Sequence, residues 1–290
     1  MKKIFIVFIL SLLLSPLFAQ EEAQPEKTSD PVRNTFSTEL LIENQTVATP
    51  YKGGIQLQIQ HRFSPIESIH NLYGIYGSAN TRIGLNYGIT DRLMIGAGTT
   101  KDYALQDIRW KYLILQQTEN NSMPVSLSYY GNIVIDARDE ENFGPSTDFK
   151  QMHRLSYFTQ LIIARKFSEK ISAQIAPSFI YMNTVKRYSD DVGYKNMNFG
   201  LHAGARANLF GNHSLILEYD QLLTKQDVGD ETDEMEQPKP NLAFGWEIGT
   251  ATHSFQVFAS NYNLIIDQYN LLYSTTSREY LFGFNITVRF

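Results

Sequence analysis

LFGFNITVRF, residues 281–290, alternates apolar and polar positions up to the last residue. In an extended strand, one face would carry only apolar side chains, those of Phe282, Phe284, Ile286, Val288 and Phe290. The opposite face would carry glycine and polar side chains. A membrane β-barrel strand has this pattern, with its apolar face toward lipid. The last strand of a soluble β-sandwich also alternates, so the rest of the chain must decide between the two.

The start of the chain predicts export. Two lysines precede an almost unbroken apolar run, residues 4–17, and small and polar residues follow at Ala19 and Gln20. We predict residues 1–20 as a signal peptide, because the run is too short to span a membrane comfortably. Residues 21–52 are polar and are predicted to form a periplasmic N-terminal segment, with a position under or inside the domain formed by residues 53–290 left open.

Composition excludes several classes of protein. The absence of cysteine excludes disulfides, thiolate metal sites and cysteine catalysis. A net charge of −5 argues against nucleic-acid binding. The 17 Tyr and 18 Phe are typical of a barrel in which lipid-facing and lumen-facing residues average out, although a large soluble β protein would share this composition.

Alternating segments recur along the chain. Twelve are predicted: residues 54–63, 80–89, 93–100, 106–116, 125–135, 154–166, 171–182, 197–209, 214–221, 242–249, 255–260 and 281–290. Short and long connections alternate between them, except that the link after Thr100 is of intermediate length. The apolar faces carry almost no charge, with Arg165 the exception. A charge near the membrane midplane costs roughly 2–4 kcal/mol. We predict an all-β fold, a transmembrane antiparallel up-and-down β-barrel of about 12 strands, with long loops outside.

Several stretches resemble a known family. They are QHRF at 60–63, TRIGLNYGITDRLMIGAG at 81–98, KYLILQ at 111–116, LIIARKF at 161–167 and FGFNI at 282–286. The chain resembles the Bacteroidetes-type membrane-bound β-barrel proteins of unknown function. The resemblance implies a cell outer-membrane location, with lipid and the barrel-insertion machinery as partners, and no established activity. The terminal aromatic strand, residues 282–290, resembles the insertion signal of such barrels.

The sequence offers no simple catalytic or metal site. Some outer-membrane lipid hydrolases use a His and a Ser two residues apart on one strand, and none of the six histidines here is followed by Ser at that spacing. A Ser, His and acid from different strands stays open. The acidic run Asp227, Asp230, Glu231, Asp233, Glu234 and Glu236 lacks EF-hand spacing and is interpreted as a solvated loop. We expect no enzyme and no cofactor.

The polar faces point to the lumen as the functional region. Its predicted lining includes Arg62, Arg82, Arg109, Lys111, His202, Arg206, Glu218, Asp220 and Glu247, together with Arg289 and Gln and Asn residues. Cations outnumber acids in this set, six to three, which predicts a passive channel or transporter preferring small polar or anionic solutes. Alternatively, the charges pair across the lumen and fill it, giving a structural or partner-binding surface barrel. A membrane lipid hydrolase is the third hypothesis.

The loop of residues 262–279 has unusual apolar runs at 264–266 and 271–273. Either the flanking strands continue past the membrane, or the loop folds inward as a lid. Strand continuation is the slightly favoured prediction, because these runs lie close to the neighbouring strands.

Overall fold

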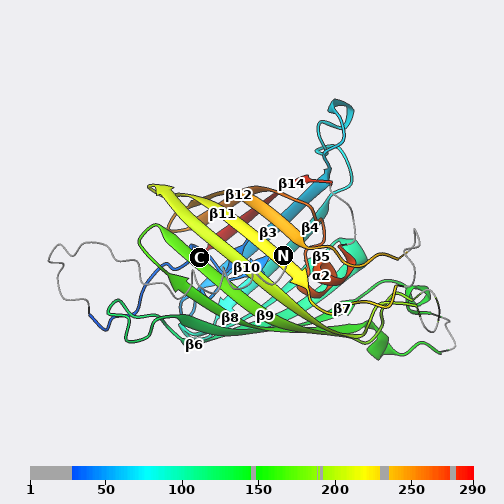
Figure 1. Ribbon diagram of the computed structural model, residues 1–290, viewed down its shortest axis with the longest axis horizontal. Helices are drawn as coiled ribbons and strands as arrows, with labels where there is room; N and C mark the ends of the chain where they lie inside the picture. Colours follow the sequence, from blue (N-terminus) through cyan, green and yellow to red (C-terminus); the bar gives the residue numbers. More distant parts are fainter. Residues whose placement is uncertain (1–27, 145–147, 188, 190–191, 229–234, 275–278) are drawn as a thin grey trace, which may run out of the picture.

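The fold is a closed antiparallel barrel, seen in a computed structural model that describes residues 28–144, 148–187, 189, 192–228, 235–274 and 279–290. Twelve strands, β3 to β14, follow one another around the barrel, and β14 pairs with β3 to close it (Figure 1). The predicted fold class and strand number are confirmed. The predicted signal peptide, residues 1–20, lies outside the described residues.

The barrel strands begin and end within two residues of the predicted bounds. They are β3 Ile55–Pro65, β4 Asn80–Gly88, β5 Leu93–Thr100, β6 Leu105–Leu115, β7 Ser126–Asp136, β8 Leu155–Lys166, β9 Ile171–Met182, β10 Met197–Phe210, β11 His213–Leu222, β12 Asn241–Gly249, β13 His253–Ser260 and β14 Leu281–Arg289. Short 3₁₀ helices lie in the connections: η1 Ile69–Asn71, η2 Asp102–Ala104, η3 Glu140–Phe143 and η5 Gln151–Arg154.

The register between neighbouring strands places their apolar faces on the outside of the barrel. At the closing pair, Ile286 of β14 lies opposite Ile59 of β3, and the neighbouring Asn285 lies opposite Gln60. Because side chains alternate along a strand, a slip of one residue would send the glutamines into lipid. Outward residues such as Ile108 are exposed on the barrel surface, whereas Gln60 is buried within it.

A hairpin from the N-terminal segment occupies the lumen. Residues 36–47, here called the plug, are almost all buried, and they contain the short strands β1 (Leu40–Leu41) and β2 (Asn44–Gln45). These residues therefore do not form a free periplasmic segment. Of the two other placements considered from the sequence, under the barrel or inside it, the structure has the segment inside the barrel. The turn residue Ile42 has φ 56°, a left-handed conformation that β-branched residues rarely adopt. The surrounding wall must hold that turn.

A second segment enters the lumen from the long-loop end. Residues 262–274, here called the lid, follow β13 and contain the helix α2 (Asp267–Tyr273), whose residues are buried except for Tyr273. In Figure 1, α2 lies within the end of the barrel where the long loops gather. The favoured prediction, strand continuation, is wrong: β13 ends at Ser260 and β14 begins at Leu281. Apolar side chains of the loop are buried by folding inward instead.

Candidate functional site: the plugged lumen

The predicted lining residues all lie inside the barrel. Arg62, Arg82, Arg109, Lys111, His202, Glu218, Asp220 and Glu247 are buried, and Arg206 is partly exposed. The structure brings them together with the plug and the lid, rather than around an open passage. A role in ion selectivity stays a prediction.

Two charged wall residues hold the plug. The guanidinium of Arg62 on β3 lies 2.7 Å from the Glu43 carboxylate of the plug, and both side chains are buried. The Glu218 carboxylate on β11 accepts the backbone N–H groups of Glu43 and Asn44, each at 2.8 Å. Burial raises the pKa of Glu43, and the adjacent Arg62 opposes that rise by favouring the carboxylate. Side chains of the wall therefore satisfy the backbone N–H groups of Glu43 and Asn44 and the Glu43 carboxylate.

The strained turn of the plug is held in the same way. The N–H of Ile42 donates to the Gln256 side chain at 3.1 Å, and its carbonyl accepts from Asn285 at 2.6 Å. On the other side of the lumen, the Lys111 ammonium donates to the carbonyls of Ala48 and Glu39 at 3.0 and 3.3 Å. The plug is thus bonded on several sides, from strands far apart in the sequence.

The wall carries a carboxylate that the sequence analysis missed. Asp107 on β6 lies 2.8 Å from both Arg82 and Arg109, and its side chain is fully buried. It belongs to the same period-2 face as Arg109, which is the signal that could have identified it. Asp136, at the end of β7, is a second buried inward carboxylate that was missed, and adding both changes the balance from six cations and three acids to six and five. The lumen charges therefore pair with one another here, as the alternative hypothesis of a filled lumen expects, because the Asp107 carboxylate binds two arginines.

The lid bonds to the wall and to the group that holds the plug. The Tyr262 hydroxyl donates to Glu218, so one carboxylate contacts both segments. The Gln268 amide donates to Asn132 of β7 at 2.9 Å, and Asn132 donates to Asp267 at 3.1 Å. Burial raises the pKa of the Asp267 carboxyl, partly opposed by the Arg109 guanidinium. An ionised Asp267 carboxylate therefore makes docking of the lid less favourable.

The lumen beneath the lid is apolar on one side. Phe158 of β8 and Ile180 of β9 face inward and are buried. They belong to one core cluster with Leu271 and Leu272 of α2. The alternation of the strands predicts polar inward faces, so these apolar inward positions were not expected. Their apolar surface explains why the loop folds in rather than remaining solvated.

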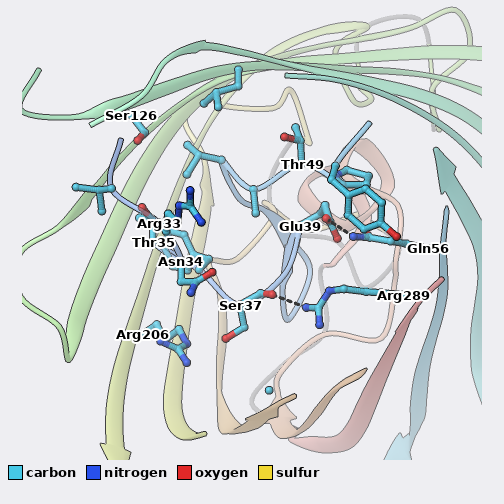
Figure 2. A pocket seen from close by; sticks show the side chains of 18 of the residues that line it. Arg33, Asn34, Thr35, Ser37, Glu39, Thr49, Gln56, Ser126, Arg206 and Arg289 are labelled. Atoms are coloured by element: carbon cyan, nitrogen blue, oxygen red, sulfur yellow. Dashed lines mark hydrogen bonds between the residues drawn. The ribbon is translucent and has the colours of Figure 1, made fainter. Parts of the chain in front are cut away.

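The short-turn end of the barrel contains an open cavity of about 800 Å³. Its lining joins the plug to the wall, including Arg206, Arg289, Gln56 and Glu39, as Figure 2 shows. Arg289 donates to the carbonyl of Ser37, and Gln56 donates to Glu39 at 2.6 Å. The plug is therefore reached by solvent from this end, where its chain enters.

Neither a metal site nor a spanning helix is found among the described residues. There, no group of three or more His, Asp or Glu side chains is arranged to hold a metal ion. No described helix is long and apolar enough to cross a membrane. In the predicted acidic loop, Asp227 pairs with Lys195 and Glu236 with Lys239, whereas Asp230, Glu231, Asp233 and Glu234 lie outside the described residues.

Sequence comparison identifies the family of this barrel. Residues 36–290 match the family described as membrane-bound beta barrel domain, DUF5777. The chain belongs to that family. The match begins at the first residue of the plug, so the plug is part of the DUF5777 domain and not an addition to it. The resemblance to a membrane-bound β-barrel family is confirmed, and a Bacteroidetes source stays a prediction. No curated protein matches the chain.

Solved structures share the barrel fold of this DUF5777 chain. The NanC porin superposes with a TM-score of 0.52 at 7% identity, covering 81% of this chain and 98% of that one. The KdgM porin gives 0.49 at 7% identity, covering 82% and 99%. An outer-membrane channel from Pseudomonas putida F1 gives 0.45 at 13% identity, covering 84% and 97%. At such identities, the NanC likeness establishes the fold alone.

Proposed function

We propose that this protein is an outer-membrane channel for small polar solutes, closed by its plug and opened when the plug leaves the lumen. The supporting observation is that the wall encloses a two-stranded hairpin. A barrel filled by its own side chains would have no room for a second piece of chain. The passage is blocked by a segment covalently joined to β3 and otherwise held by hydrogen bonds and an ion pair.

Charge supports a preference for anions in the open state. The plug brings the carboxylates of Glu39 and Glu43 into the lumen. When it leaves, Arg62 loses its ion-pair partner and Lys111 loses its two carbonyl acceptors. The wall set then has six cations against five acids, so its potential favours small anions only weakly. The short-turn end would face the periplasm, where the cavity gives the plug room to move.

Planar-bilayer conductance tests the proposal. The mature protein should show rare openings, and a variant lacking residues 28–47 should conduct steadily, with a reversal potential in a salt gradient that indicates weak anion preference. A folded barrel that stays silent after plug removal would contradict the proposal. It would favour a structural or partner-binding barrel.

A further inference from the structure

A serine, a histidine and an aspartate form a hydrogen-bonded chain across three adjacent strands of the wall. Ser178 lies on β9, His202 on β10 and Asp220 on β11, and all three side chains are buried inside the barrel. His202 Nε2 lies 3.0 Å from Ser178 Oγ, and His202 Nδ1 lies 2.9 Å from Asp220 Oδ1. We propose that this chain is the catalytic triad of a serine ester hydrolase that acts beneath the lid.

The hydrogen-bond pattern fixes the proton positions that such chemistry needs. Asp220 Oδ1 and the side-chain oxygen of Asn44 are both acceptors near Nδ1, each at 2.9 Å. Nδ1 therefore carries the proton, an assignment that follows from the network, and Nε2 is left to accept the Ser178 hydroxyl proton. Asn44 also donates to Asp220 at 2.8 Å, which holds the carboxylate in place. A nucleophile, its base and a group orienting the base are thus in the required order.

Two features next to Ser178 fit the same role. Gln160 of β8 lies directly opposite Ser178 in the strand pairing, and neither amide atom of Gln160 has a hydrogen-bond partner among the described residues. Its N–H₂ group is a free donor for the oxyanion of a tetrahedral intermediate. On the other side, Gly200 is paired with Ser178, and a Cβ there would lie 2.7 Å from Ser178 Oγ. The glycine leaves the hydroxyl room.

The surroundings indicate an ester with an apolar acyl group. The ring of Phe158 meets the His202 imidazole edge-on, with centroids 5.7 Å apart, and Ile180 follows Ser178 on the same inward face. The Leu271 side chain of the lid covers Gly200 next to Ser178. An acyl chain could replace the lid leucines on this apolar surface. The site is therefore closed in this structure and becomes accessible from the long-loop end when the lid lifts.

The proposed reaction balances without a cofactor. Ser178 Oγ attacks the ester carbonyl carbon while His202 Nε2 takes its proton. Collapse of the intermediate breaks the bond to the leaving alcohol, which receives that proton from His202, and an acyl-serine remains. Water then attacks the acyl group, gives a proton to His202, and the carboxylic acid leaves as Ser178 recovers its proton. The channel proposal is not needed for any of these steps.

The test uses the full-length refolded barrel with an alkyl fluorophosphonate, which reacts with activated serines, and with p-nitrophenyl butyrate. It is run on the wild type and on a lid-opened variant, Leu271→Asp with Leu272→Asp. We expect labelling mapped to Ser178, together with ester hydrolysis that falls at least 1000-fold in Ser178→Ala and His202→Gln, on the order of other triads. Ser172→Ala, a buried inward serine on the same strand, is the matched control and should keep both activities. Gln160→Ala should lower kcat about 100-fold with little change in KM.

An accessibility measurement makes a negative result decisive. Because the chain has no cysteine, Ser178→Cys provides one thiol whose reaction with maleimide reports access to the site. If that thiol reacts in the lid-opened barrel but Ser178 is neither labelled nor hydrolytic, the triad is only polar packing and the proposal fails. It fails equally if the thiol is unreachable with the lid open, or if Ser178→Ala keeps the activity. Heat-modifiable migration on gels verifies that each variant is folded.

Discussion

Replacing Glu43 with alanine should release the plug without unfolding the barrel. The Arg62 guanidinium has no exposed surface and lies 2.7 Å from the Glu43 carboxylate. Removing one partner of a buried ion pair costs about 3–5 kcal/mol, because the remaining charge is left uncompensated. Arg62 keeps a hydrogen bond to Asn285 at 3.0 Å, so the lower end of this range applies. The released state avoids the cost, since water reaches Arg62 once the plug has left.

A cost of about 3 kcal/mol shifts the equilibrium between docked and released plug by roughly 100-fold. Single-channel recording at fixed voltage measures that shift as open probability. Glu43→Gln keeps the size and a hydrogen-bond acceptor, and should give a smaller increase, about tenfold. Glu169→Ala, which removes an exposed pair with Lys166 at a short turn, should change nothing. An open probability within threefold of wild type for a folded Glu43→Ala barrel would refute the reasoning.

Two further predictions concern the wall and the lid. Asp107→Ala leaves the buried Arg82 and Arg109 without their shared carboxylate. The free energy of unfolding should therefore fall by about 3–5 kcal/mol, as measured by urea titration of the refolded barrel. An unchanged midpoint would show that Asp107 does not stabilise the wall. Burial raises the pKa of Asp267 above its ordinary 3.8, against the opposing effect of the Arg109 guanidinium. The docked lid thus binds more protons than the free lid, and docking should weaken as pH rises from below 3.8 through the raised pKa. Hydrogen exchange of α2, corrected for intrinsic rates, should be slower at pH 4 than at pH 7; the opposite order would count against it.

The strands could be predicted because each one carries its own evidence. A period of two places apolar residues toward lipid, and a segment such as residues 171–182 shows this without knowledge of its neighbours. Asp107 was equally available, since it shares a face with Arg109. The lining residues followed from the same alternation, and all nine face the lumen.

The plug and the lid could be named only as alternatives, because their partners are distant in sequence. Glu43 and Asn44 are bonded by Glu218, 175 and 174 residues away, and nothing local marks residues 36–47 as a lumen segment. The apolar runs of residues 262–279 suggested an inward-folded lid as one possibility. The apolar surface that receives the lid is spread over several strands, so no single segment of sequence reveals it. The Ser178, His202 and Asp220 chain likewise appears only once the register places His202 opposite Asp220.

A reversible covalent lock tests most directly whether the plug closes the barrel. A Cβ at Gly204 of β10 would lie 2.6 Å from a terminal methyl carbon of Leu41, so the side chains of these two positions are in contact, and Leu41→Cys with Gly204→Cys introduces the only two thiols of the chain there. The account predicts that the oxidised double variant shows no openings in a planar bilayer and that reduction in the same membrane restores them. Conductance that continues unchanged with the disulfide formed would contradict it, because the solute path would then bypass the plug.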